Sequence, residues 1–178
     1  MPDLITFDEI THLFTSFQHT AWRLETQRGY ATDRDSPNWP RFQRGETFGY
    51  DPANPWQAAV RRQTQTGKRY ERVRLVDNPP TEGQRFLLAT GLGNVAAGED
   101  IRNLWRTDAA RLGLPDYDFW LFDSRILVKF VIDDHGVTLG LRVLEDAESV
   151  VRACQARDAA WHHAVPTGRF QAQVPSAG

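Results

Sequence analysis

The feature that most constrains the fold is a set of three apolar segments within residues 118–143, DFWLFDSRILVKFVIDDHGVTLGLRV. The first, residues 118–123, has apolar residues on both faces, which is typical of a strand covered on both sides. In the next two, residues 126–132 and 137–143, side chains alternate at the period of a strand. The DDHG link at residues 133–136 combines aspartates with a glycine that permits positive φ. The sequence therefore predicts an antiparallel meander of three strands.

The N-terminal part of the chain predicts one helix and one strand. The motif TFDE at residues 6–9 is a capping box. Apolar residues follow it at helical spacing, which predicts an amphipathic helix of about three turns. Residues 21–26, AWRLET, predict a strand on which Trp22 points to one side while Arg23 and Glu25 share the other. A charged pair on one face of a strand either forms an ion pair or faces a ligand.

Between this strand and the meander, helices and strands alternate. A helix capped by Asn54 precedes a strand over residues 69–76. A short helix through residues 86–88 then breaks at Gly91 or Gly93, because glycine is a poor helix former. The glycines do not form a phosphate loop, which requires a preceding strand and usually a lysine.

A strand over residues 101–106 leads towards the meander, and a final helix over residues 146–164 follows it. The acidic start of that helix suits the helix dipole. Together the elements predict an α+β domain: a mixed five- or six-stranded sheet with a C-terminal antiparallel meander, flanked by helices. We expect a single domain over residues 1–170 and a loosely ordered tail over residues 171–178, where small and polar residues dominate.

A long aperiodic segment, residues 29–54, interrupts the pattern with glycines, prolines and isolated aromatics. Long ordered loops in compact domains are often functional. Aromatic side chains here either anchor a lid onto the domain or present an apolar surface to another protein, because aromatic anchors are frequent hot spots of protein contacts. The candidate partner-binding residues are Trp39, Phe42, Phe48 and Tyr50.

Composition narrows the function. The net charge is −2, which disfavours direct binding to nucleic acid. The acidic N-terminus does not resemble a signal peptide, and no apolar stretch reaches the length of a membrane span, so we expect a cytoplasmic protein without membrane association. A single cysteine, Cys154, excludes an internal disulfide and a cysteine-based zinc site. The histidines lack metal-ligand spacing, so we expect no metal and no cofactor.

Charged residues supply the remaining candidates. Residues 61–74 hold a basic run in which Arg72 and Arg74 share one strand face. The favoured interpretation is an exposed face balanced by the acidic residues 145–148. The alternative is a site for a small anionic ligand. For that site we expect Trp22, Arg23, Glu25, Arg72 and Arg74 to lie near one another, because adjacent strands with alternating charges form one polar face.

Four segments carry a resemblance to a known family: AWRLET at residues 21–26, AGEDIR at residues 97–102, DFWLFD at residues 118–123, and the WHHAVP ending at residues 161–166. Over nearly its full length the chain resembles an actinobacterial family of single-domain proteins of unknown function. Its members are commonly encoded beside Xre-type helix-turn-helix regulators. The resemblance implies a fold and a genomic setting, and it implies no activity and no catalytic residues.

Two functional hypotheses remain. The preferred one is a non-catalytic regulatory or ligand-sensing protein that acts with a helix-turn-helix transcription regulator. The alternative is a small cytoplasmic enzyme that uses carboxylate and arginine chemistry, with Glu25 or Glu99, in a cleft under residues 29–54. A pocket with convergent polar groups would favour a ligand or a substrate, whereas a flat apolar patch would favour a protein partner.

Overall fold

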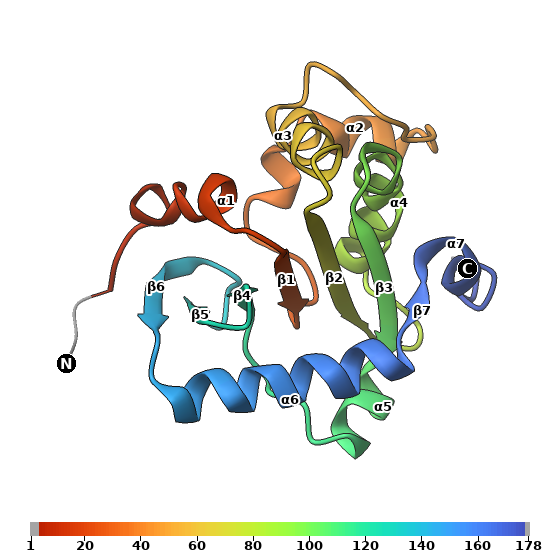
Figure 1. Cartoon of the computed structure of the whole chain (residues 1–178). Helices are drawn as coiled ribbons and strands as arrows, with labels where there is room; N and C mark the ends of the chain where they lie inside the picture. Colours follow the sequence, from red (N-terminus) through yellow and green to blue (C-terminus); the bar gives the residue numbers. More distant parts are fainter. Residues whose placement is uncertain (1–3, 177–178) are drawn as a thin grey trace.

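The computed structural model describes residues 4–176 and is built on one seven-stranded sheet in the order β6-β5-β4-β1-β2-β3-β7 (Figure 1). The strands are β1 (Thr20–Glu25), β2 (Arg69–Val76), β3 (Asp100–Trp105), β4 (Phe119–Phe122), β5 (Ile126–Ile132), β6 (Thr138–Leu144) and β7 (Val165–Pro166). β1, β2 and β3 are parallel, and every other pairing is antiparallel. The α+β class and the meander β4-β5-β6 are confirmed.

The expected strand count was too low because of β7. This strand has two residues, one of them a proline, and pairs with the outer edge of β3. A strand that short has no side-chain periodicity, and proline is depleted in strands. The pairing follows from tertiary position: α6 delivers the chain to that edge.

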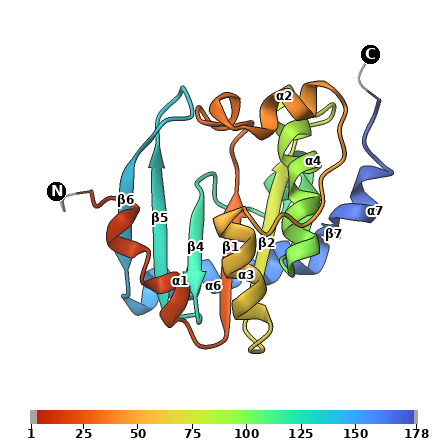
Figure 2. The ribbon, with the colours of Figure 1, turned by 90° about the horizontal axis from the view of Figure 1, so that it is seen from above.

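Helices cover both faces of the sheet. They are η1 (Asp8–Ile10), α1 (Leu13–Ser16), η2 (Asp33–Asp35), α2 (Asn38–Gln43), α3 (Pro55–Thr64), α4 (Glu82–Ala97), α5 (Arg106–Arg111), α6 (Ala147–His163) and α7 (Thr167–Gln171). α6 crosses one face, whereas α1, α3 and α4 lie on the other (Figures 1 and 2). None of the helices within residues 4–176 is long and apolar enough to cross a membrane.

The first predicted helix was wrong in its length. Residues 8–16 form a 3₁₀ turn and a single α turn instead of one continuous helix. The hydroxyls of Thr11 and Thr15 donate to backbone carbonyls three residues earlier, at 2.9 and 3.0 Å. Such local bonds compete with regular helix bonding. Glu9 does accept hydrogen bonds from the backbone and the hydroxyl of Thr6, so part of the capping box is present.

The predicted break at Gly91 or Gly93 was also wrong, because α4 continues through both to Gly98, a left-handed cap with φ 119°. The two glycines permit close packing. A Cβ on Gly93 would lie 2.8 Å from the carbonyl oxygen of Gly49, and one on Gly91 would lie 2.5 Å from Nη1 of Arg74. α4 therefore packs close to the sheet beneath it and to the segment beside it.

Two apolar cores flank the sheet. One lies under α6 and includes Trp22, Leu24 and Phe119. The other lies under α1 and α3 and includes Tyr70, Trp120 and further aromatic rings. A smaller cluster holds α7 against α4 and β3 through Phe170. The sheet is thus covered on both faces, as the apolar residues on both sides of β4 predicted.

The final helix begins as expected, with the side chain of Asp146 accepting a hydrogen bond from the backbone of Ser149 at 2.9 Å. At the end of α7, the side chain of Gln171 donates to the carbonyl of Leu88, and Val174 beyond it packs beside Phe170. The loosely ordered tail over residues 171–178 stays a prediction, and its last two residues lie outside the described residues.

Candidate functional site

Two neighbouring parallel strands carry the charged residues of the site. β1 and β2 pair so that Arg23 lies beside Arg72 and Glu25 beside Arg74. Because side chains alternate between the faces of a sheet, all four charged residues lie on the face covered by α1, α3 and α4. Trp22 points to the opposite face and packs in the core under α6. Four of the five predicted ligand-binding residues are therefore together, and Trp22 is not. Their role in binding stays a prediction.

Glu25 is at the centre of a buried ion network. Its Oε2 accepts a hydrogen bond from Nε of Arg74 at 2.5 Å, its Oε1 accepts from Nη1 of Arg72, and Nε of Arg23 lies 3.6 Å away. Glu99 accepts from Nε of Arg72 at 2.6 Å. The Glu25 side chain is 6% exposed and that of Arg72 10% exposed. The exposed basic face that the sequence favoured is therefore wrong, because internal carboxylates neutralise the arginines and permit their burial.

Asp118 completes the network from the other half of the sheet. Its Oδ2 accepts from Nη2 of Arg23 at 2.9 Å and from the hydroxyl of Tyr30 at 2.5 Å. Its Oδ1 accepts from the backbone N–H and the hydroxyl of Thr26 at 2.7 and 2.8 Å. Tyr30 and Asp118 were not among the residues expected in the site. Tyr30 lies in the aperiodic segment, and Asp118 meets Arg23 only because β4 pairs with β1.

The protonation states of the network follow from these contacts. Burial alone would raise the pKa of Glu25, but the charges of Arg72, Arg74 and Arg23 outweigh it and hold that pKa well below its usual range. Burial and the neighbouring charge of Glu25 raise the pKa of the Tyr30 hydroxyl well above its usual value. At neutral pH Glu25 is therefore ionised and Tyr30 is protonated, so neither exchanges a proton readily.

Aromatic rings cover the guanidinium groups. The guanidinium carbon of Arg23 lies 4.1 Å from the ring centre of Phe130 and 5.5 Å from that of Trp120. That of Arg72 lies 5.5 Å from Trp120 and 6.0 Å from Trp56. A cavity of about 370 Å³ opens beside these side chains. Its other lining residues are Phe7, Glu25, Tyr30, Thr32, Asp33, Arg74, Leu87, Thr90 and Asn94. We call this space the arginine cavity.

The aromatic residues of the segment over residues 29–54 divide into two pairs. Trp39 and Phe42, both in α2, pack against Phe86 of α4 with ring centres 5.0 and 5.6 Å away. Trp39 is only 8% exposed. These two rings therefore anchor the segment onto α4.

The second pair lies beside arginine side chains. Phe48 lies beneath the guanidinium group of Arg41 at 4.9 Å, and Tyr50 beneath that of Arg61 at 4.1 Å. Both aromatic side chains are partly exposed. Contact between this pair and a partner protein stays a prediction.

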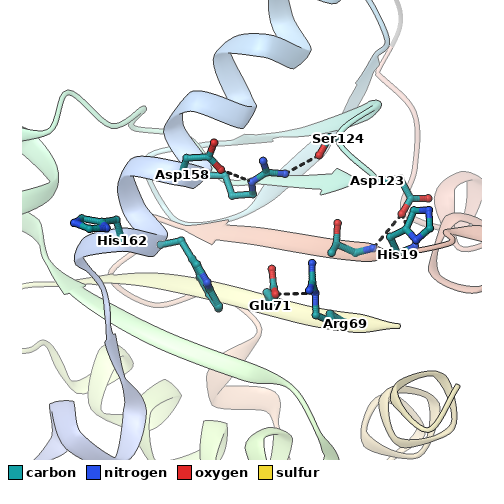
Figure 3. A pocket seen from close by; sticks show the side chains of 10 residues that line it. His19, Arg69, Glu71, Asp123, Ser124, Asp158 and His162 are labelled. Carbon is teal, nitrogen blue, oxygen red and sulfur yellow. Dashed lines mark hydrogen bonds and ion pairs between the residues drawn. The ribbon is translucent and has the colours of Figure 1, made fainter. Parts of the chain in front are cut away.

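A second, larger hollow of about 620 Å³ lies on the opposite face, between α6 and the starts of β1 and β2 (Figure 3). Its charged groups pair among themselves: Arg69 with Glu71 at 3.2 Å, and Arg157 with Asp158 at 2.9 Å. Nη1 of Arg157 also donates to the Ser124 hydroxyl at 2.7 Å. We call this space the helix groove.

A tight turn between β4 and β5 borders the helix groove. Asp123 and Ser124 have φ values of 50° and 55°, the left-handed region that favours glycine. The Asp123 carboxylate accepts backbone N–H bonds from Gln18, His19 and Thr20 at 2.7, 2.7 and 3.0 Å. The turn therefore holds the start of β1 in place by hydrogen bonds. This structural role explains the strained backbone of Asp123 and Ser124.

Residues 8–172 match the model of a family described as a domain of unknown function, DUF6879. The chain belongs to this family. The matched range includes the whole ion network and nearly all of both hollows, so the DUF6879 domain contains the site from β1 to the last strand. No curated protein matches the chain. Within the part of the DUF6879 chain that the structure describes, no three His, Cys, Asp or Glu residues converge as metal ligands.

Proposed function

We propose that this DUF6879 chain is a non-catalytic, ligand-sensing regulatory protein whose ligand occupies the arginine cavity. The observation that carries the proposal is a surplus of hydrogen-bond donors on three arginines whose side chains are largely buried. A guanidinium group has five N–H donors, yet within residues 4–176 Arg23 makes one hydrogen bond, Arg72 two and Arg74 two. Nε of Arg23 is buried without any hydrogen-bond partner. Donors left unpaired in a buried site cost free energy that a ligand with acceptor atoms recovers.

The surrounding carboxylates leave these donors unpaired. Both oxygens of Glu25, Glu99 and Asp118 already accept hydrogen bonds from arginine, tryptophan, tyrosine or threonine groups. The remaining arginine donors beside the cavity are therefore free to bind acceptor atoms of a ligand. Cavities that combine aromatic walls with a few fixed polar groups are the usual form of small-molecule sites.

The enzyme hypothesis receives less support from the same groups. A general acid or base works best when its pKa lies near the operating pH. The three arginines hold the pKa of Glu25 far below neutral. Glu99 is bonded to Arg72 and Trp56, and its side chain is fully buried. Carboxylates fixed in this way position arginines rather than transfer protons.

A route from the ligand to a partner is built into the segment over residues 29–54. Tyr30, Thr32 and Asp33 line the arginine cavity, and the chain then continues into α2 and the partly exposed aromatic pair Phe48 and Tyr50. A ligand that binds one conformation of this segment more tightly than another shifts the equilibrium towards the conformation it prefers. The resemblance to actinobacterial proteins encoded beside Xre-type regulators suggests which protein responds to that conformational change. The proposed partner is a cytoplasmic helix-turn-helix regulator.

The test is to purify the protein from its own organism and to identify retained small molecules by native mass spectrometry. Thr90→Met extends a side chain into the arginine cavity without removing a charge, and Thr107→Met, on exposed α5, is the matched control. We expect a retained molecule in the wild type and in Thr107→Met, and its loss in Thr90→Met. Calorimetry then measures binding to the helix-turn-helix regulator encoded beside the protein, with and without that molecule. A difference in affinity would show that ligand binding and regulator binding are coupled.

A retained molecule that survives Thr90→Met would place the ligand elsewhere and contradict the proposal. Absence of any retained molecule, together with no heat of binding to the regulator at tens of micromolar with both proteins folded, would favour the enzyme hypothesis.

A further inference from the structure

The charge of the arginine cavity restricts its ligand more tightly than its donors do. The three guanidinium groups of Arg23, Arg72 and Arg74 stand against four carboxylates, those of Glu25, Asp33, Glu99 and Asp118. Asp33 lines the cavity without an ion pair in the described chain, and it accepts a hydrogen bond from the backbone of Tyr30 at 2.7 Å. Whether Asp33 is ionised or protonated, the cluster has no net positive charge.

The arginine cavity therefore supplies hydrogen-bond donors but no net positive charge. Sites for phosphate-rich ligands place arginine or lysine against the phosphates as counter-charge. Here Glu25, Glu99 and Asp118 already supply the counter-charge of the arginines. A polyanion would lose its hydration shell and find no net positive charge in return, and an uncompensated buried charge is costly. An acceptor group that is neutral or carries a single charge avoids most of that cost.

The walls determine the shape of the ligand. Trp56, Trp120 and Phe130 are among the lining residues, together with the half-exposed Phe7. α4 contributes Leu87 and residues with small polar groups to the same lining. Flat apolar rings pack against aromatic side chains in offset or edge-on arrangements, which adds to the free energy of burial.

Accepting the ligand site proposed above, we infer that its ligand is a planar aromatic or heteroaromatic molecule that presents one carboxylate or amide-type carbonyl to Arg23, Arg72 and Arg74. The ring lies against the tryptophan and phenylalanine wall. The acceptor takes hydrogen bonds that the protein leaves unmade. Phosphorylated molecules of similar size are excluded by the charge balance, and organic cations are excluded because an ammonium group has no acceptor for the unpaired arginine N–H groups.

A matched series of four probes tests this inference, because the ring is constant while the head group changes. The probes are 4-fluorobenzoate, 4-fluorobenzamide, 4-fluorophenyl phosphate and 4-fluorobenzylamine, and binding is followed by fluorine NMR line broadening with the full-length protein. Small fragments bind weakly in general, with Kd values on the order of a millimolar. We expect 4-fluorobenzoate and 4-fluorobenzamide to bind at least tenfold more tightly than the other two.

The location is tested with the same variants as before. Thr90→Met should weaken binding of 4-fluorobenzoate at least fivefold, whereas Thr107→Met should leave it unchanged. A second blocking variant, Asn94→Leu, guards against a folding defect in the first, and circular dichroism checks both.

Each outcome separates the inference from the proposed function on which it rests. Tightest binding of 4-fluorophenyl phosphate, or of 4-fluorobenzylamine, at a site sensitive to Thr90→Met would overturn the inferred ligand class and leave a ligand-sensing site standing. Binding that is insensitive to both blocking variants would overturn the inferred location. If none of the four probes binds a folded protein, the inferred ligand class is overturned, and the ligand-sensing function is then decided by the retained molecule alone.

Discussion

β2 presents the same chemistry to two different environments. On the face under α6, Arg69 pairs with Glu71 in the helix groove, with the arginine side chain 68% exposed. On the other face, Arg72 pairs with Glu25 and Glu99 in the arginine cavity, with all three side chains at most 10% exposed. Exposed ion pairs contribute little to stability, whereas breaking one partner of a buried pair is costly. The ion pairs of the larger hollow should therefore contribute less to stability than those of the arginine cavity, because burial rather than cavity volume determines the strength of an ion pair.

The strongest way to test this comparison is Glu25→Gln. The substitution keeps the shape of the side chain but removes the negative charge that Arg23, Arg72 and Arg74 share. Leaving buried charges uncompensated should lower the free energy of unfolding by about 3–5 kcal/mol. Urea denaturation measures the change. A loss below about 1 kcal/mol, the range of exposed pairs, would mean that solvent reaches the network and that the two faces are alike.

Acid should weaken the same network. The folded-state pKa of Glu25 lies below the usual value of 4.5, because the arginines outweigh the effect of burial. The unfolded chain then binds more protons than the folded one at low pH, so the stabilisation is complete above about pH 4.5 and is lost as the pH falls below it. The difference in unfolding free energy between wild type and Glu25→Gln should therefore shrink from pH 5 downwards. A constant difference across that range would contradict the assignment.

Gly91→Ala tests the network without changing its charge. An added Cβ would lie 2.5 Å from Nη1 of Arg74, which donates to the carbonyl of Leu87 at 2.7 Å. Displacing that donor should cost about 1–2 kcal/mol, even though alanine favours a helix. The control is Gly168→Ala in α7, where an added Cβ would have no neighbouring atom within 4 Å. There the free energy of unfolding should rise by about 0.5–1 kcal/mol, because alanine favours a helix over glycine. Thermal unfolding of both variants should give shifts of opposite sign.

A smaller effect is expected at the turn beside the helix groove. Ser124→Gly should be more stable than Ser124→Ala by up to about 1 kcal/mol, because glycine adopts a φ of 55° without strain. Both variants lose the hydrogen bond from Arg157, so Ser124→Ala, which keeps the strain, should be destabilising. If Ser124→Gly were no more stable than Ser124→Ala, strain at this turn would not be a cost to the fold.

The smallest effect should come from Glu71→Gln, the counterpart of Glu25→Gln on the other face. Its partner Arg69 is mostly exposed, so the change in stability should stay within about 1 kcal/mol. Burial raises the pKa of Glu71 whereas that of Glu25 is lowered. Its ionisation therefore opposes folding, and that opposition disappears as the pH falls through its raised pKa towards 4.5. Urea denaturation at pH 7 and pH 4 checks both points.

Local patterns predicted the strands and the position of the charges on them. Alternation placed Arg23 and Glu25 on one face of β1, and Arg72 and Arg74 on one face of β2. The pairing of the two strands brought these two faces together on the same side of the sheet. Burial was not predictable in the same way, because an arginine-rich strand looks exposed until its counter-charges are found. Glu99 comes from the turn before β3, which no local pattern links to β2.

Other parts of the site depended on the order of the sheet. Asp118 reaches Arg23 because β4 lies next to β1, a choice that the meander alone leaves open. The continuation of α4 through Gly91 depended on its packing against Arg74, whereas helix propensity considers the helix alone. Tertiary contacts override local preference at these positions, and they are also the positions that form the arginine cavity.

The sheet order also has a consequence for the way the protein is made. β1 is at the centre of the finished sheet, but its two neighbours arrive at very different times: β2 follows within about 45 residues, whereas the partners Arg23 and Asp118 are separated by 95 residues in the chain. Domains are synthesised from the N-terminus at a limited rate. While the ribosome completes β4, the future centre of the sheet is an open strand edge with Arg23 still lacking Asp118. Nascent chains stalled before residue 118 should therefore be the forms of this protein that most need chaperones.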